Sequence, residues 1–354
     1  MPRPTRPLVT PLVLALLGFG AIVGNYQTSV PLGMSPVVGV ERETPDTTAL
    51  PVAVGPAETS PAVAASDRAT EAGALPSGSG AAPGSAADAE RGALTSRSGR
   101  DPVLREKGPD QPLTVADLEA DRLLRARLSG PRPDYGWLSE ETADDPVRLR
   151  RRRVWIVDPL DGTRSFLEGR PEFAVSIGLV EDGVAVVGVV CNPASGELFW
   201  AVRGEGAWVE RVGEEAGARR LAVRAPAEGE GAVLFASRRE LVAGEFEAFR
   251  GRWAIRPLGS TAYKLAQVAA GEGDAYLSRG PKSEWDVCAG ALLVEEAGGR
   301  ATDLWGRALR YNAPEPSVQG IVAAGPRLHG PLLALVRSLG PAARPAGGGD
   351  RDGG

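Results

Sequence analysis

The sequence predicts a layered α/β fold in which strands and helices alternate along one folded segment. Three features indicate it. The apolar run Val154–Val157 ends at an aspartate, as a buried strand does where it reaches a loop. Two further apolar runs flank Asp182-Gly183, a dipeptide that favours a tight hairpin turn. Helical spacing of apolar residues follows Thr114 and again Ser260, so helices are expected to cross between the strands.

Composition divides the chain of 354 residues into three parts. Residues 1–100 are rich in Ala, Pro, Gly, Ser and Thr, and 45–100 contain almost no aromatic residues, so we expect a disordered N-terminal extension. One folded domain is expected over 101–340, followed by a disordered tail over 341–354. An apolar fraction of 43% is sufficient for a sizeable core in the folded part.

An apolar segment at residues 8–24 follows Arg3 and Arg6. This is the layout of a signal peptide or of a short membrane anchor. The segment contains Pro11, is slightly short for a spanning helix and has no clear cleavage site, so a third reading is an upstream extension outside the working protein. We expect a cytoplasmic protein, with membrane anchoring through residues 8–24 as the alternative.

Charge and rare residues restrict the function. A net charge of −5 and a pI near 5.3 argue against a nucleic-acid polymer as partner. One histidine, His329, and two cysteines exclude a histidine-rich zinc site and disfavour a Ser-His-Asp or Cys-His nucleophile. Cys191 and Cys288 lie in apolar runs, which predicts buried free thiols in a reducing compartment. The expected chemistry is therefore carboxylate chemistry.

The first helix of the folded segment begins after Thr114. Its apolar face is predicted to be Ala116, Ala120, Leu124 and Leu128. Asp117 stands three residues after Thr114, where the acid of a capping box lies. The alternative is that the Asp117 carboxylate faces a functional site.

The later elements follow from turn residues and apolar periodicity. We expect strands at 173–181, 184–192, 197–203, 207–211 and 232–237, and then a helix at 239–250. Ser260 caps a helix that ends at Gly271. The remaining elements are a strand at 275–278, a helix that opens near Asp286 and closes at Gly298-Gly299, a strand at 319–324 and a helix at 328–339.

Acidic residues gather around the strand at 154–157. Asp158 and Asp161 follow its apolar run, and Glu140 and Glu141 precede it. Oxygen ligands without imidazole or thiolate suit magnesium, which keeps open positions for a substrate phosphate. The competing reading is a solvated turn, because Asp-Pro and Asp-Gly are common turn formers.

A basic run separates these two acidic groups. Arg148 and Arg150 to Arg153 lie between the glutamates and the strand. We expect a solvated connecting loop there in preference to a phosphate-binding patch.

Five motifs in this order resemble the inositol monophosphatase superfamily. They cover about residues 101–325 and are Lys107…Pro112-x-Thr114-x-x-Asp117, Leu138-Ser139-Glu140-Glu141, Trp155-x-x-Asp158-Pro159-Leu160-Asp161-Gly162-Thr163, Gly259-Ser260 and Trp285-Asp286-x-x-Ala289-Gly290. The resemblance implies a sugar-phosphatase-like αβαβα sandwich and a magnesium-dependent phosphoric monoester hydrolase. One departure is that the region before Asp101 does not show the long amphipathic helix with which such proteins usually begin. A non-catalytic relative that binds phosphate ligands is therefore an alternative.

The resemblance also implies the roles of the site residues. Glu140, Asp158 and the backbone carbonyl of Leu160 would hold one Mg²⁺. Asp158, Asp161 and Asp286 would hold a second, and Glu140 would lie beside a third. Thr163, supported by Asp117, would orient the attacking water together with Glu140, and two cations would stabilise the reacting phosphate. Lithium inhibition is expected as well. For Asp286 the competing reading is a carboxylate that complements a helix dipole.

Within the superfamily, the motif that continues through Arg164 and Phe166 resembles the CysQ-type 3′(2′),5′-bisphosphate nucleotidases. Glu284 before Trp285 agrees with this, whereas Ser165 stands where these enzymes tend to have Glu. The implied reaction converts adenosine 3′,5′-bisphosphate to AMP and phosphate. Inositol-1-monophosphatase is the alternative, and phosphatases of other sugar phosphates or of histidinol phosphate share the scaffold.

The partner expected from these motifs is a small phosphorylated metabolite. The backbone amides of Gly162 and Thr163 can cradle phosphate oxygens. Ser260 and Lys264 are candidates for the rest of the substrate, against readings as a helix N-cap and a solvated helix residue. Lys282 is a candidate for a second phosphate. The chain is expected to be a monomer or a homodimer.

Overall fold

The computed structural model describes residues 103–106, 112–214, 217–226 and 231–339, which all belong to one compact unit. The expectations for residues 1–100, for the apolar segment 8–24, for Lys107 and for the tail 341–354 concern residues outside these ranges. None of the helices in the described part of the chain is long and apolar enough to cross a membrane.

The larger sheet has seven strands. Its order is β3 (Gly136–Ser139), β4 (Arg153–Asp161), β5 (Ala174–Glu181), β6 (Val184–Asn192), β7 (Glu197–Val202), β8 (Gly206–Arg211) and β9 (Arg219–Arg220). Strands β3 and β4 are parallel, and the other pairs are antiparallel. The hairpin predicted at Asp182-Gly183 is confirmed, because both residues have positive φ angles of 50° and 78°, as a type I′ turn requires.

A second sheet has five strands. Its order is β11 (Trp253–Pro257), β10 (Ala232–Ala236), β12 (Ala275–Ser278), β16 (Ile321–Ala324) and β14 (Arg300–Thr302). Two small ribbons complete the strands, β1 (Val103–Glu106) with β2 (Pro112–Thr114) and β13 (Lys282–Ser283) with β15 (Ser317–Val318).

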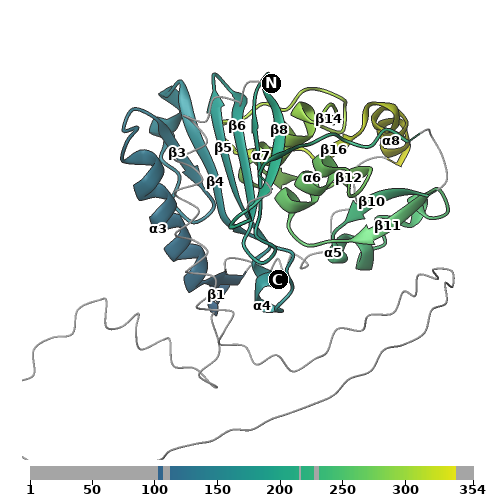
Figure 1. The fold of residues 1–354 in the computed structure, drawn as a ribbon, viewed down its shortest axis with the longest axis horizontal. Helices are drawn as coiled ribbons and strands as arrows, with labels where there is room; N and C mark the ends of the chain where they lie inside the picture. The colour runs from purple at the N-terminus through teal and green to yellow at the C-terminus, as the bar shows by residue number, and fades with distance from the viewer. Residues whose placement is uncertain (1–102, 107–111, 215–216, 227–230, 340–354) are drawn as a thin grey trace, which may run out of the picture. The chain divides into compact units, whose positions relative to one another are not determined.

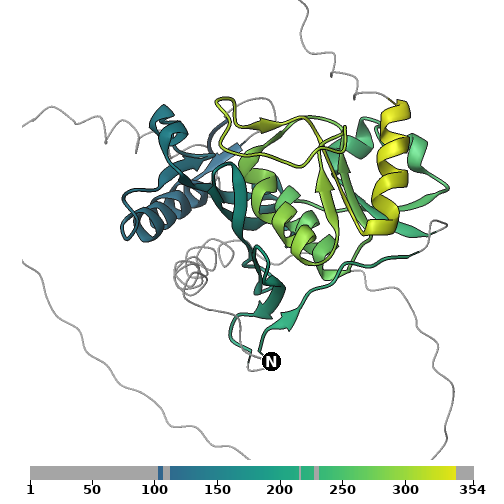
Figure 2. The ribbon, with the colours of Figure 1, turned by 90° about the horizontal axis from the view of Figure 1, so that it is seen from above.

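Helices cover the sheets and separate them (Figures 1 and 2). Helix α3 (Val115–Ser129) packs on the outer face of the seven-stranded sheet, and α6 (Thr261–Ala270) and α7 (Glu284–Glu296) lie between the two sheets. Helix α8 (Pro326–Leu339) packs on the far face of the five-stranded sheet. The remaining helices are short: η1 (Pro146–Arg150), α4 (Thr163–Leu167), α5 (Arg238–Val242) and η2 (Glu247–Phe249). The predicted αβαβα layering is confirmed.

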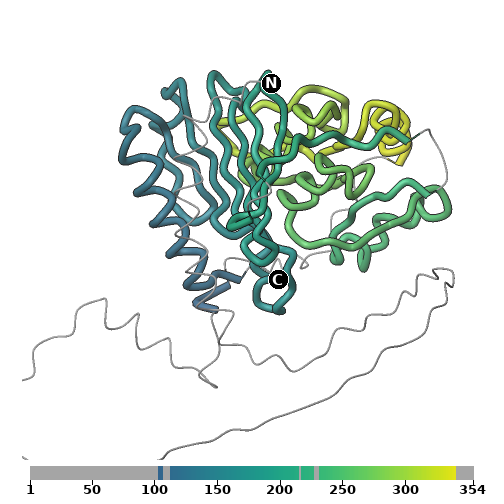
Figure 3. The backbone as a smooth tube through the Cα atoms, viewed as in Figure 1, coloured from purple at the N-terminus to yellow at the C-terminus, as the bar shows by residue number. Residues whose placement is uncertain are grey.

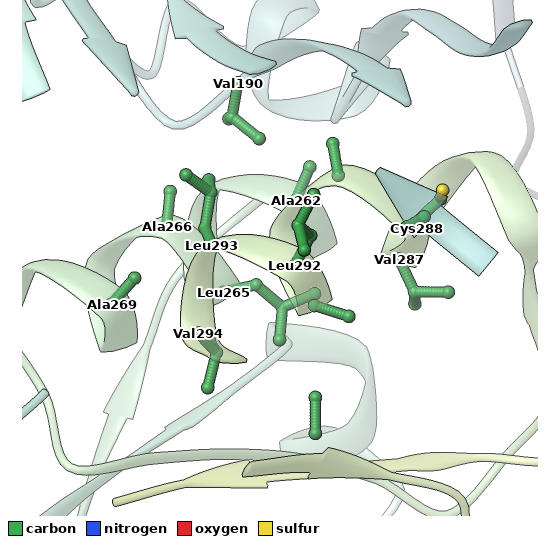
Figure 4. Close-up of a cluster of buried hydrophobic side chains, with 14 of the residues drawn as sticks. Val190, Ala262, Leu265, Ala266, Ala269, Val287, Cys288, Leu292, Leu293 and Val294 are labelled. Carbon is green, nitrogen blue, oxygen red and sulfur yellow. The ribbon is translucent and has the colours of Figure 1, made fainter. Parts of the chain in front are cut away.

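Strand alternation divides the apolar residues between layers. Along β4, Ile156 joins the cluster around α6 and α7, whereas Trp155 and Val157 join the cluster around α3. Successive side chains of a strand point to opposite faces, so one strand contributes to two cores. Figure 4 shows the cluster between the sheets, which includes Leu265 of α6 and Leu292 of α7.

Glycines allow helix α7 to approach the large sheet closely. A Cβ atom on Gly178 would lie 2.5 Å from Cys288 Sγ, and one on Gly188 would lie 2.7 Å from the Ala289 carbonyl oxygen. Real Cβ atoms do not approach other atoms so closely, so glycine is required where β5 and β6 meet the helix. This contact fixes the first turn of α7, and therefore Asp286, relative to the sheet. Cys191 and Cys288 are buried free thiols, as predicted.

Most predicted elements are present, and one is wrong. The helix expected at 239–250 is interrupted: α5 ends at Val242, and only the short η2 follows. Gly244 has a φ of 73°, a left-handed conformation that ends the helix. In the two larger sheets, strands β3, β9, β11 and β14 were not predicted. The predicted strand at 154–157 continues as β4 through Asp161, with a register irregularity between Asp158 and Asp161.

The basic run is not a uniformly solvated loop. Arg148 is 2% exposed and pairs with Asp144 at 2.5 Å, and it also donates to the Asn312 side chain at 2.7 Å. Arg152 and Arg153 pair with Glu181. Arg148 therefore joins the loop after β3 to the segment before β15.

Candidate functional site

Three carboxylates form a compact group between β4 and α7. Asp158, Asp161 and Asp286 each place one oxygen within 4.8 Å of the other two. Asp158 is 1% exposed and Asp161 is 9% exposed. The solvated-turn reading of this motif is therefore wrong, because the aspartates belong to a buried strand that turns toward a helix start.

Local backbone geometry directs the two aspartates of β4. The irregular register between Asp158 and Asp161 breaks strict alternation, so both side chains reach the same site. The Leu160 amide donates to Asp158 Oδ1 at 2.9 Å and fixes that carboxylate. Asp286 lies in the first turn of α7, where a helix dipole favours a negative charge. The dipole reading of Asp286 and its membership of the group are thus compatible.

Asp161 is held by the start of helix α6. Its Oδ2 accepts hydrogen bonds from the Ser260 hydroxyl and from the Ala262 amide, both at 2.6 Å. Ser260 Oγ also accepts from the Tyr263 amide at 2.9 Å, so the predicted N-cap is confirmed. Ser260 has a φ of 55°, a strained conformation for a residue with a side chain. These contacts fix the Asp161 carboxylate where β4 meets the start of α6.

Glu140 approaches the group from the loop after β3. It does not belong to the 4.8 Å group among the described residues, but its charge acts on all three aspartates. Its backbone amide donates to the Val157 carbonyl at 3.2 Å and continues the pairing of β3 with β4. Glu141 is adjacent, and its amide donates to Ser139 Oγ at 3.4 Å.

Thr163 lies between Asp117 and the end of β4. Its hydroxyl oxygen is 3.1 Å from Asp117 Oδ1 and 3.0 Å from the Leu160 carbonyl oxygen. A hydroxyl has one proton, so it donates to one of them at a time. The other Asp117 oxygen accepts from the Thr114 amide at 2.8 Å, which completes a capping box. The capping-box reading of Asp117 is therefore confirmed, and its other oxygen faces Thr163, whose role in a functional site stays a prediction.

The carboxylates in the group carry like charges, which repel one another. Burial raises the pKa of Asp158 well above its usual value, and the charges of Glu140, Asp161 and Asp286 raise it further. Burial also raises the pKa of Asp286, followed by the charges of Asp161 and Glu140. Clustered carboxylates that raise one another's pKa are stabilised by a bound cation, and an all-oxygen donor set suits a hard divalent ion. The residues present therefore fit a magnesium site.

Two lysines, Lys264 and Lys282, lie close enough to the carboxylates for their charges to interact with Asp161 and Asp286, and the Lys282 side chain is partly exposed. Lys264 is 2% exposed, so the reading of a solvated helix residue is wrong. Its Nζ donates to the Leu258 carbonyl at 3.2 Å and stands over the Tyr276 ring. Burial and the charge of Lys282 lower the pKa of Lys264 to about 8, although the charge of Glu240 acts in the opposite direction. The Lys282 ammonium is 3.6 Å from Glu240 Oε1.

Glu240 was missed by sequence reasoning. It is 8% exposed, accepts from the Ser278 hydroxyl at 2.6 Å and forms a capping box with Ser237. The signal was available, since Ser-x-x-Glu before an apolar stretch is the capping-box signature. The proximity of Glu240 to Lys264 and Lys282 depends on three separate elements and has no signal in the sequence.

Gly162 forms the turn between β4 and α4. Its φ is 94°, and a Cβ atom there would lie 3.0 Å from the Glu172 carbonyl oxygen. Glycine is required by both facts. The Phe166 amide donates to the Gly162 carbonyl at 3.1 Å, which forms the first hydrogen-bonded turn of α4. The amides of Gly162 and Thr163 lie at the start of this turn.

The layered fold and the carboxylates at the end of β4 and at the start of α7 define the class of this protein, which is that of the phosphoric monoester hydrolases. The chain belongs to the inositol monophosphatase family, whose sequence profile matches residues 82–340. An inositol-1-monophosphatase from Rhizobium meliloti is 41% identical over 208 residues, which are 56% of this chain and 75% of that protein.

Solved structures of the family have the same fold. The extragenic suppressor protein suhB from Bartonella henselae is 34% identical with a TM-score of 0.57, and the alignment covers 66% of this chain and 87% of suhB. CysQ from Bacteroides thetaiotaomicron is 30% identical with a TM-score of 0.52, covering 61% and 85%. Similarity extends to relatives with both kinds of name, so it supports the superfamily assignment and leaves the subfamily open.

Proposed function

We propose that the protein is a magnesium-dependent phosphomonoesterase that hydrolyses a small anionic metabolite. The observation that carries the proposal is the group of Asp158, Asp161 and Asp286, whose oxygens lie within 4.8 Å of one another. Glu140 and the Leu160 carbonyl complete the proposed ligands. Bound magnesium would supply positive charge to the phosphate and acidify a water molecule.

The side chains around that group have complementary roles in the proposal. Glu140 and the Thr163 hydroxyl orient the attacking water, and Asp117 holds Thr163 at 3.1 Å. The amides of Gly162 and Thr163 bind phosphate oxygens at the turn into α4. Because water attacks directly, no covalent enzyme intermediate is required.

The favoured substrate is adenosine 3′,5′-bisphosphate, with AMP and phosphate as products. The support is the pair of lysines, of which Lys264 carries charge that interacts with both Asp161 and Asp286. If magnesium neutralises Asp161 and Asp286, the two ammonium groups are left with one carboxylate, Glu240, and the surplus positive charge on this side of the site would suit a second phosphate. Ser260 is proposed to act on the substrate through Asp161.

Inositol 1-phosphate is the second candidate substrate. The Rhizobium meliloti relative is named an inositol-1-monophosphatase, and that name is the observation that favours it. A monophosphate of a neutral polyol would not require the surplus charge of Lys264 and Lys282. The two candidates therefore make different demands on the lysines.

A substrate panel tests the proposal. Phosphate release is measured from adenosine 3′,5′-bisphosphate, inositol 1-phosphate, fructose bisphosphate and histidinol phosphate, with magnesium, with chelator and with lithium. We expect magnesium-dependent release that chelator abolishes and lithium inhibits. Folded protein that releases no phosphate from any of the four would contradict the proposal, and ligand binding without turnover would favour a non-catalytic relative.

A lysine variant tests the substrate preference. Lys264→Met keeps much of the apolar stem and removes the charge. We expect KM for adenosine 3′,5′-bisphosphate to rise about tenfold or more while that for inositol 1-phosphate changes little, because a charge-assisted contact contributes about 1.5–3 kcal/mol. Equal changes for the two substrates would show that Lys264 does not select the second phosphate. Arg252→Met, at an exposed position, is the matched control.

A further inference from the structure

Helix α3 carries two buried carboxylates one turn apart, and each contacts a different loop of the site. Asp117 faces Thr163, as described above. Asp121 is 7% exposed and accepts from Ser139 Oγ at 2.5 Å through Oδ1 and from Thr142 Oγ1 at 2.6 Å through Oδ2. Residues four apart lie on the same face of a helix, so α3 presents both carboxylates to the site loops.

The two hydroxyl groups that Asp121 binds stand on either side of Glu140. Ser139 is the last residue of β3, and Thr142 lies two residues beyond Glu140. The Glu140 amide is itself bound to the Val157 carbonyl at 3.2 Å. The segment 139–142 is therefore held to α3 at both ends and to β4 in the middle.

Glu140 is the proposed ligand whose place depends most on its loop. Asp158 and Asp161 belong to β4, and Asp286 belongs to the first turn of α7, so regular elements fix these three. Glu140 follows β3 and is not part of the 4.8 Å group. A carboxylate on a loop reaches a cation reproducibly only when other contacts fix that loop.

We propose that Asp121 is a positioning residue, which places Glu140 at the cation site by holding Ser139 and Thr142. The inference rests on the proposed function, because it concerns the same cation site. Asp121 touches neither the substrate nor the reacting atoms in this proposal. Its two hydrogen bonds act on the site through the loop alone.

The test is the variant Asp121→Asn. Asparagine keeps the size of the side chain but replaces one acceptor oxygen with a donor, so one of the two hydroxyl contacts must reverse or break. Calorimetric titration with magnesium alone, without substrate, should show a dissociation constant raised about tenfold. The magnesium concentration for half-maximal activity should rise in parallel, with kcat at saturating magnesium nearly unchanged. Glu119→Gln, on the same helix, is the matched control and should leave both values unchanged.

Loop variants keep the proposal testable if Asp121→Asn does not fold. Ser139→Ala and Thr142→Val retain the Asp121 carboxylate and should each weaken magnesium binding, with non-additive effects in combination with Asp121→Asn. An Asp121→Asn protein that unfolds at lower temperature but binds magnesium normally would overturn the inference. A wild-type protein that hydrolyses no ester, but whose magnesium affinity depends on Asp121, would refute the proposed function and retain the inference.

Discussion

The Ser260 hydroxyl donates to Asp161 Oδ2 at 2.6 Å, although the two residues are 99 positions apart in the chain. One belongs to the start of a helix between the sheets and the other to the end of a strand. The bond therefore joins the start of α6 to the end of β4, where Asp161 belongs to the carboxylate group. Figure 3 traces the backbone through the sheets and the helices between them.

The first prediction concerns Ser260 itself. Ser260→Ala removes a hydrogen bond to a buried carboxylate and should destabilise the protein by about 1.5–3 kcal/mol. Ser260→Gly loses the same bond but relieves the positive φ of 55°, so it should be more stable than Ser260→Ala by about 1 kcal/mol. Urea unfolding of the two variants measures the difference. Equal stability would show that the backbone at this position is not strained.

Asp161 should be essential for turnover without being essential for folding. Asp161→Asn removes the charge of a proposed ligand and should lower kcat by at least about a hundredfold. Burial raises the pKa of the Asp161 carboxyl, so its neutralisation does not remove a stabilising charge in the absence of cations. Phosphate release and circular dichroism check the two expectations. Asp134→Asn, at an exposed position, is the control. Retained activity would mean that Asp161 is structural.

Glu240 should make stability depend on acid pH. Although burial raises its pKa, the charges of Lys282 and Lys264 and hydrogen bonds from Ser278 and Ser237 lower it to about 2, against an ordinary value of 4.5. A lowered pKa in the folded state stabilises the protein above pH 4.5, and this contribution is lost as the pH falls toward about 2.

The wild type should therefore lose about 3 kcal/mol more than Glu240→Gln across that pH range. Unfolding free energies of both proteins at pH 7, 4 and 2.5 measure the difference. Parallel pH curves for the two proteins would show that Glu240 titrates normally in the folded state.

Arg148 should be required for stability. Its buried guanidinium binds Asp144, Asn312 and the Ala313 carbonyl. Arg148→Ala leaves these acceptors without a donor and should cost about 3 kcal/mol, the lower end of the range because Asp144 is partly exposed. Denaturant unfolding measures the cost. The neighbouring Arg150→Ala, at an exposed position, should change stability little, and a similar loss in both variants would contradict the assignment.

Local sequence patterns identified much of the fold. Thr114 with Asp117, Ser260 with Gly271, and Asp182-Gly183 mark boundaries through capping and turn chemistry that acts over a few residues. The predicted helix at 239–250 was wrong because Gly244 ends it within one turn of α5. Short-range chemistry thus sets the boundaries of these elements, and the wrong helix also has a local cause, a glycine in the left-handed conformation.

The sequence by itself determined that Glu140, Asp158, Asp161 and Asp286 are the acidic candidates, because their residue types and motifs are local properties. Only the tertiary structure decided that Asp158, Asp161 and Asp286 share one site, that Lys264 is buried close to it, and that Asp121 binds the loop carrying Glu140. These relationships join residues from different strands and helices, and packing across the layers brings them together. Periodicity along the chain carries no record of such contacts.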